Sequence, residues 1–318
     1  MVLEIARRFL LVPMIASNVA TPTLTSRLVN GLLSIKPLFN WAKGQARTLM
    51  IKRAADIGVD WFGRVQALMA QDLATELAAI ENPELVYPDY YLRPFHAYDA
   101  GNLSWEAATE VEVAAYAVHA RIWPDAGPQG DPRLRQSYHQ VLQARIPTPP
   151  QRILDLGCSV GMSTFALQDL YPEAEVLGLD LSPYFLAIGN IRAKEQQRQV
   201  QWIHAPAESS GLPTASLDLV SACLLFHELP QSAARQILTE ARRLLKPGGY
   251  FALMDMNPAS PVYAQMSPAI LTLLKSTEPY LDQYFSLDMA ETLEQAGFEN
   301  ITLQPNTPRH RVVVAQAC

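Results

Sequence analysis

Short apolar runs alternate with helical segments through the second half of the chain, and this alternation constrains the fold more than any other feature. Apolar runs bounded by turn residues indicate buried strands, and the segments between them are long enough to form helices. The expected strands are Arg152–Leu156, Glu175–Asp180, Gln201–His204, Leu217–Cys223, Tyr250–Met256, Asn300–Leu303 and Arg311–Ala315. The last two are joined by too few residues for a parallel crossover, so we expect one to run antiparallel. The pattern predicts an α/β fold with a seven-stranded, mostly parallel sheet covered on both faces.

Helices are expected between these strands. Their ranges are Met162–Leu170, Tyr184–Lys194, Ser232–Leu245 and Ser286–Ala296, with Ser182 as the cap of the second. An insertion over residues 257–285 precedes the last of them.

The first half of the chain has helical periodicity and little strand pattern. Helices are expected around residues 46–53, over Trp61–Ile80, from an N-cap at Ser104, and over Leu134–Ala144, with a loop at Pro124–Pro132. Prolines separate an extended, aromatic-rich segment, Tyr87–Tyr98. The sequence therefore predicts an N-terminal helical region over residues 1–145 and an α/β domain over residues 146–318, with the boundary at Pro147–Pro150.

Composition excludes several classes of protein. Hydrophobic residues make up 49% of the 318 residues and charged ones 18%, so the chain can bury a large core. The net charge of −6, without a basic stripe, argues against a nucleic acid partner. The three cysteines, Cys158, Cys223 and Cys318, are too few and too far apart for a disulfide framework or a structural zinc site. We therefore expect a cytoplasmic location.

The N-terminus carries two basic residues, Arg7 and Arg8, before the apolar run Phe9–Ile15. A signal peptide would have this order, but Glu4 and Pro13 disfavour one. We expect an amphipathic helix packed on the body of the protein, with weak peripheral membrane contact as the alternative. No apolar run is long enough to span a bilayer.

The sharpest local signal is the strand–turn–helix segment Ile153–Thr164. Its glycines, Gly157 and Gly161, lie in a turn that brings backbone N–H groups and a helix N-terminus close to a ligand. A dinucleotide site requires a third glycine, and Met162 stands there instead. Asp155 would repel a pyrophosphate, but it suits an ammonium group, directly or through water, while the helix N-terminus suits a carboxylate.

This turn resembles the first signature of class I S-adenosylmethionine-dependent methyltransferases, with Ser159 in place of the middle glycine. Val176–Pro183 is similar to the second signature, Ala205–Glu208 to the adenine-side loop with Pro206 in place of an acid, and Arg242–Tyr250 to the RxLKPGG turn. The resemblance implies a Rossmann-like fold and S-adenosylmethionine as cofactor, with Asp180 accepting the ribose hydroxyls. The implied cofactor-binding residues are Asp155, Gly157, Ser159, Gly161, Asp180, Leu181, Ala207, Glu208 and Cys223.

The segment after the fourth strand, Leu224–Pro230, resembles the branch with ubiquinone and menaquinone methyltransferases, which implies a small aromatic or apolar acceptor methylated at oxygen or carbon. His227 is the candidate base because its ordinary pKa is close to neutral, and Asp255 is a second catalytic candidate; a backbone-capping role for His227 stays open. We expect Glu228 to face solvent, with orientation of the His227 imidazole as the alternative. No metal is expected, because Asp255 and Asn257 are not adjacent.

Acceptor specificity is expected from the N-terminal region and the insertion. The aromatic segment is interpreted as a lid over the cofactor cleft, so that Tyr91, His96, Tyr98 and His227 contact the acceptor; plain packing between the two halves is the alternative for each aromatic residue. Two other functions stay open. One is a cofactor-binding but catalytically idle subunit, and the other is a protein methyltransferase.

Overall fold

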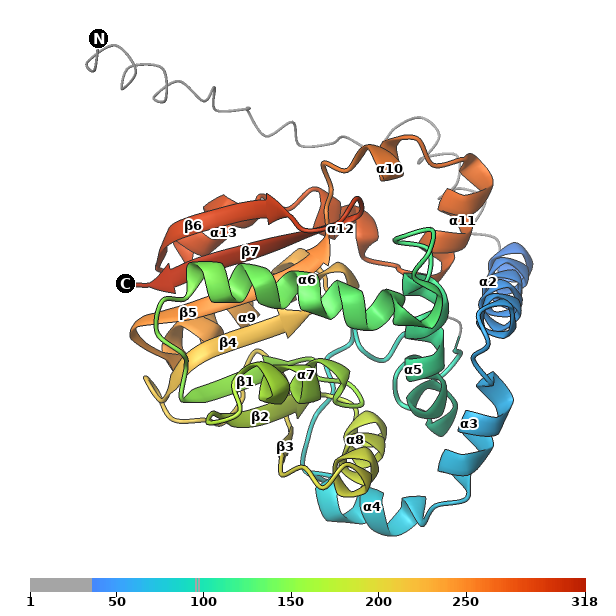
Figure 1. The fold of residues 1–318 in the computed structure, drawn as a ribbon, viewed down its shortest axis with the longest axis horizontal. Coiled ribbons are helices and arrows are strands. Elements are labelled where there is room, and N and C mark those ends of the chain that lie inside the picture. The colour runs from blue at the N-terminus through green and yellow to red at the C-terminus, as the bar shows by residue number, and fades with distance from the viewer. Residues whose placement is uncertain (1–35, 95, 97) are drawn as a thin grey trace.

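The computed structural model describes residues 36–318, except residues 95 and 97. A seven-stranded sheet in the order β3-β2-β1-β4-β5-β7-β6 forms the centre of the molecule (Figure 1). Its strands are β1 (Arg152–Leu156), β2 (Glu175–Asp180), β3 (Gln201–His204), β4 (Leu217–Cys223), β5 (Leu245–Met256), β6 (Phe298–Pro305) and β7 (His310–Ala317). Strands β1 to β5 pair in parallel, whereas β7 runs antiparallel to both β5 and β6. The predicted fold class and the antiparallel last strand are confirmed.

Two layers of helices cover the sheet. Helices α6 (Gly130–Arg145) and α7 (Met162–Leu170) pack on one face through Leu134, Tyr138 and Leu167. Helices α9 (Gln231–Leu244) and α13 (Met289–Gln295) pack on the other face, and α8 (Pro183–Glu195) lies beside β2 and β3. The strands between these layers are almost completely buried, which explains why they read as continuous apolar runs.

Several helix boundaries differ from the sequence expectation, and local capping explains them. The expected helix over Trp61–Ile80 is two helices, α3 (Trp61–Met69) and α4 (Leu73–Ile80), because Asp72 accepts a hydrogen bond from the Thr75 N–H and starts a new helix. Helix α13 begins at Met289 because Asp288 caps it through the Glu291 N–H. The predicted caps Ser104 and Ser182 are confirmed.

The expected loop at Pro124–Pro132 is largely helical, with a 3-10 turn η1 (Gly127–Gln129) leading into α6. Helix α6 begins four residues before the expected Leu134, because Pro132 lies in its first turn, where no intrahelical N–H is required.

The remaining elements stand at the carboxyl ends of the parallel strands, on the right of Figure 1. They are α2 (Lys36–Asp56) and α5 (Trp105–His119) from the N-terminal region, and α10 (Pro261–Ala264), α11 (Pro268–Thr277) and α12 (Leu281–Phe285) from the insertion. Helix α2 packs against both α5 and α11, so the two additions meet. Within residues 36–318, no helix is long and apolar enough to cross a membrane. The expected N-terminal amphipathic helix and its membrane contact lie outside the described residues.

Candidate active site

A cavity of about 720 Å³ opens at the carboxyl ends of β1, β2 and β4. The sheet order reverses between β1 and β4, and ligands of open α/β sheets bind at this position. The volume lies within the range of small-molecule sites, about 300–1,000 Å³. The Rossmann-like domain, the N-terminal helices and the insertion all contribute described lining residues.

The glycine turn after β1 has the backbone conformation that only small residues adopt easily. Gly157 and Gly161 have φ angles of 63° and 83°, and Ser159 is also left-handed at 50°. A Cβ atom on Gly161 would lie 2.9 Å from the ring carbons of Phe165 and Trp202. Gly157 and Ser159 line the cavity, whereas Gly161 caps α7 behind it, so the turn presents the start of that helix to the cavity.

Asp155 lies beneath this turn and does not line the cavity. Its side chain is fully buried, and its Oδ2 accepts hydrogen bonds of 2.7 Å from the hydroxyls of Ser163 and Thr164. Burial raises its pKa to about 6, against the opposing effect of these two bonds. Its Oδ1 atom is buried and has no partner among the described residues, so an acceptor atom remains available beside the turn.

Asp180 ends β2 and lines the cavity. Its carboxylate accepts hydrogen bonds of 2.8 Å from the backbone N–H groups of Ser159 and Ser182, which fix its position at the edge of the glycine turn. Burial raises the pKa of Asp180 to about 7, although these two N–H groups oppose the shift. A buried acid at this edge can accept hydrogen bonds from hydroxyl groups of a ligand.

The other predicted cofactor-binding residues divide into two groups. Leu181, Ala207 and Cys223 line the cavity. Glu208 does not, and instead accepts a 2.6 Å hydrogen bond from the Tyr90 hydroxyl, which brings Tyr90 to the cavity wall. Leu224, next to Cys223, has a φ of 60°, an uncommon conformation for a branched residue that places its side chain on the wall as well.

His227 and Asp255 form a buried pair between the turn η2 (Phe226–Glu228) and β5. The Nδ1 atom of His227 lies 2.7 Å from Oδ1 of Asp255, which also accepts the backbone N–H of His227 at 3.2 Å through Oδ2. Burial disfavours the charged imidazole, but Asp255 and then Glu278 outweigh it, so the pKa of His227 rises to about 10. His227 lines the cavity and Asp255 stands behind it.

Two carboxylates that the sequence alone did not assign to the site complete this group. His96 Nε2 lies 3.3 Å from Glu228 Oε1 and 3.6 Å from Glu278 Oε1, while His227 Nε2 lies 3.9 Å from Glu278 Oε2. All four side chains line the cavity. The expectation that Glu228 faces solvent is wrong: its side chain is 19% exposed, and His96 lowers its pKa against the effect of burial.

Glu278 begins the turn after α11, in an insertion that carries no motif. Burial raises its pKa, while His96 and His227 oppose the rise. The sequence could only have indicated this residue through its place in the insertion. Among the described residues, no group of three or more His, Cys, Asp or Glu side chains is arranged to hold a metal ion.

Tyrosines of the aromatic segment reach the cavity. Tyr91 and Tyr98 both line it. The Tyr98 hydroxyl donates a 2.8 Å hydrogen bond to Glu110 of α5, so this buried hydroxyl has a protein partner. The Tyr91 hydroxyl is buried and has no partner among the described residues. Burial raises its pKa well above the ordinary value, and the nearby charge of Asp180 raises it further.

These residues fit a nucleoside with an amino-acid tail. Asp180 offers an acceptor to ribose hydroxyls, and the helix N-terminus at the glycine turn suits a carboxylate. The Oγ of Ser159 and the hydroxyl of Tyr91 are buried and unpartnered among the described residues, and both residues line the cavity, so a ligand can satisfy these polar atoms. The fold and this cavity define a Rossmann-like enzyme that binds a nucleoside cofactor at the switch point of its sheet.

Comparisons with known proteins agree with this description. Residues 153–249 match a family model described as a methyltransferase domain. An uncharacterized methyltransferase of Synechocystis is 34% identical over 164 residues, which cover 51% of this chain and 74% of that protein. A ubiquinone biosynthesis O-methyltransferase of Xanthomonas campestris is 28% identical over 197 residues, covering 60% of this chain and 81% of that protein.

The fold also matches solved structures. Phosphoethanolamine N-methyltransferase 2 of Haemonchus contortus, in complex with S-adenosyl-L-methionine, superposes with a TM-score of 0.52 at 14% identity, covering 74% of this chain and 61% of that one. The chain therefore belongs to the class I S-adenosylmethionine-dependent methyltransferases, of the quinone-methyltransferase-like kind. It is an enzyme, and S-adenosylmethionine is its cofactor.

Proposed function

We propose that this enzyme methylates an oxygen or carbon atom of a small, aromatic or apolar acceptor that binds in the cavity. One observation carries the proposal: the glycine turn, Asp180 and His227, which Asp255 holds in place from behind, all face a single space of small-molecule size. The similarity to a ubiquinone biosynthesis O-methyltransferase supports an acceptor of this class. The three free cysteines support a cytoplasmic location.

The cofactor half of the site is assigned to the glycine turn and to the ends of β2 and β4. When bound, S-adenosylmethionine supplies an electrophilic methyl group on a sulfonium. Asp180 would accept the ribose hydroxyls, and Gly157, Ser159 and the start of α7 would hold the amino-acid tail. Leu181 and Ala207 would contact the adenine, and Cys223 the methionine end. Asp155 acts indirectly by holding Ser163, which lines the cavity, and Glu208 acts by holding Tyr90.

The acceptor half is assigned to the two additions to the Rossmann-like domain. Residues 1–145 supply Tyr91, His96 and Tyr98, and the insertion 257–285 supplies Glu278 and apolar side chains of α11. Together they act as a lid that positions the acceptor and excludes water, which is the main requirement for an in-line methyl transfer.

We assign the removal of the acceptor's proton to His227 and Glu278 acting together. The raised pKa of His227 means that its imidazole carries a proton at neutral pH, so it needs a neighbour to become a base. Glu278 Oε2, 3.9 Å from His227 Nε2, has no hydrogen-bond partner among the described residues and can hold that proton. The Nε2 atom of His227 then accepts the proton of the acceptor, while Asp255 stabilises the imidazolium that forms.

The test is methyl transfer from S-adenosylmethionine labelled with tritium in the methyl group, using the purified full chain and a cell extract. Label is expected in the small-molecule fraction, and Asp180→Ala should abolish it. Asp169→Ala is the matched control, because Asp169 pairs with Arg198 on the outside of the fold. Label that appears in protein instead of extractable molecules contradicts the proposal.

A further inference from the structure

Charged side chains of both signs line the cavity wall. The acidic side chains that line it are Asp180, Glu228 and Glu278, which belong to the sites described above. Four arginines also line it. Arg135 belongs to α6, and the other three are Arg53 of α2, Arg121 just after α5, and Arg309 in the turn between β6 and β7. In Figure 1, α2 stands at the right-hand side of the molecule and β2 at the lower left of centre, so the elements that carry Arg53 and Asp180 are well apart.

The three arginines have no carboxylate partner among residues 44–318 whose side chains the structure describes. The polar contact of Arg53 there is a 3.4 Å hydrogen bond to the carbonyl oxygen of Ala117. Arg135, which also lines the cavity, is different: Asp131 accepts hydrogen bonds of 2.9 and 3.2 Å from it and neutralises it. The uncompensated positive charge is therefore confined to one group of side chains.

These arginines are also close to one another. Burial lowers the pKa of Arg53, and the charges of Arg121 and Arg309 lower it further. Like charges gathered on a cavity wall raise the free energy of the empty site, and an anion placed among them removes this cost. The planar guanidinium group binds carboxylates and phosphates through paired N–H donors.

Apolar side chains line the cavity together with the arginines. Leu49 and Met50 of α2, Val118 of α5 and Ile122 line the same cavity as Arg53 and Arg121. A ligand that fits this part of the wall therefore combines an anionic group with an apolar body.

We propose that the methyl acceptor is an anion, whose carboxylate or phosphate group is bound by Arg53, Arg121 and Arg309 while its apolar body extends through the cavity toward His227. This inference rests on the proposed function, since it describes the acceptor of that site. In this arrangement Asp180 binds the cofactor, and the three arginines bind the acceptor.

The experiment measures binding of three probes that share one apolar ring: 1-naphthoate, 1-naphthyl phosphate and the neutral 1-naphthamide. Each is titrated calorimetrically into the full chain saturated with S-adenosylhomocysteine. At least one anion is expected to bind about tenfold or more tightly than the amide, which corresponds to one good charge-assisted contact. The preferred anion distinguishes a carboxylate acceptor from a phosphate one.

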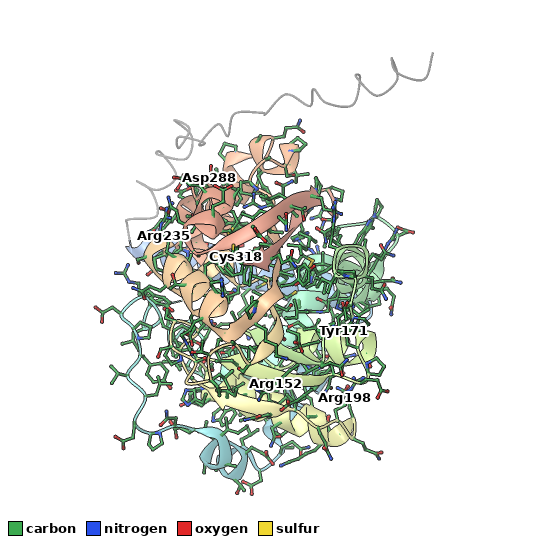
Figure 2. All side chains as sticks on the ribbon, turned by 90° about the vertical axis from the view of Figure 1, so that its left-hand side faces the viewer. Arg152, Tyr171, Arg198, Arg235, Asp288 and Cys318 are labelled. Carbon is green, nitrogen blue, oxygen red and sulfur yellow. The ribbon has the colours of Figure 1, made fainter. Side chains whose placement is uncertain are left out.

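Arg121→Gln and Arg309→Gln should each weaken binding of that anion by about five- to tenfold and change binding of the amide by less than about twofold. Arg121 is exposed, so its replacement leaves the fold intact. Arg235→Gln is the matched control, because Arg235 of α9 contacts Thr292 and Gln295 and does not line the cavity (Figure 2). It should change neither affinity.

Equal affinity for the amide and both anions overturns the inference, and so does the absence of measurable binding by either anion. The inference is also overturned if the arginine variants lose as much affinity for the amide as for the anion. Failure of the proposed function is a separate result, because it is read from methyl label in protein and not from these titrations.

Discussion

The imidazole of His227 and the carboxylate of Asp255 are 2.7 Å apart, and the Asp255 side chain is fully buried. Asp255 also accepts the backbone N–H of His227 and of Met256, so it fixes both the ring and the turn that carries it. The pair lies where the turn after β4 meets β5 and presents the remaining ring nitrogen to the cavity. This arrangement fixes the orientation of an imidazole that is protonated at neutral pH and can act as a base only after it has given up that proton.

Asp255→Asn removes the main charge that keeps His227 protonated. The pKa of His227 should then fall from about 10, because burial remains while the largest opposing charge is lost, and only Glu278 and Glu228 still raise it. Breaking a buried ion pair should also lower the free energy of unfolding by about 3–5 kcal/mol. A histidine NMR titration checks the pKa, with His139 as an internal reference, since burial already holds its pKa at about 4. A His227 signal that still titrates near the wild-type value would refute the assignment.

The same pair makes stability depend on pH. The pKa of His227 is higher in the folded chain than its ordinary 6.5, so the stabilisation is complete below that pH and is lost as the pH rises through about 10. Urea unfolding of the wild type and of His227→Gln should therefore differ most at about pH 6 and progressively less toward about pH 10. A difference that grows with pH would contradict this.

Gly161→Ala should destabilise the glycine turn through two effects. The left-handed φ of 83° costs an alanine about 1 kcal/mol, and the new Cβ atom would lie 2.9 Å from the rings of Phe165 and Trp202, which adds about 1–3 kcal/mol of overpacking. Gly58→Ala is the matched control, because Gly58 has a φ of 75° and a Cβ atom added there would meet no other atom within 4 Å. Urea unfolding should show the larger loss for Gly161→Ala; equal losses would mean that the rings do not constrain the turn.

Much of the sheet was predictable because its signals are local. Strands β1 to β4 and helix α7 have the predicted bounds, since β1, β2 and β4 are mostly buried apolar runs and the glycine turn marks the junction between β1 and α7. The break between α3 and α4 was missed because the apolar spacing continues across it, while the Asp72 cap decides the outcome. Local sequence signals therefore predict the strands and the glycine turn, but not the break between α3 and α4.

The acceptor side was only partly predictable. His96, Tyr91 and Tyr98 are aromatic or titratable residues of one segment, which the sequence places near the acceptor, and they line the cavity. Glu278 and the three arginines belong to segments without a motif, and only tertiary packing brings α2, α5, α11 and the β6–β7 turn to one space. Contacts between residues so distant in the chain leave no periodic signal in a single sequence.

Tyr91→Phe tests whether the Tyr91 hydroxyl binds a ligand or whether the ring serves only in packing. The Tyr91 hydroxyl is buried without a partner among the described residues, so its removal should leave the unliganded chain as stable as before, or up to about 1 kcal/mol more stable. If the hydroxyl bonds the bound cofactor, affinity for S-adenosylhomocysteine should fall about threefold to tenfold. Tyr98→Phe is the control, because Tyr98 bonds Glu110 and should instead lose stability. Unchanged cofactor affinity in Tyr91→Phe would leave Tyr91 with a packing role alone.

The pKa of Asp180 makes cofactor affinity depend on pH near neutrality. Burial raises that pKa to about 7, so part of the unliganded enzyme carries a neutral Asp180 at physiological pH. Ribose hydroxyls are donors and bind the carboxylate, so the protonated form binds more weakly. Affinity for S-adenosylhomocysteine should therefore be constant above about pH 8 and fall by up to tenfold per pH unit below about pH 7.

Calorimetric titration from about pH 5.5 to 8.5 measures this pH dependence. Asp180→Asn should bind more weakly with a flat profile, because its amide does not titrate. A wild-type profile as flat as that of Asp180→Asn would show that Asp180 does not contact the ribose.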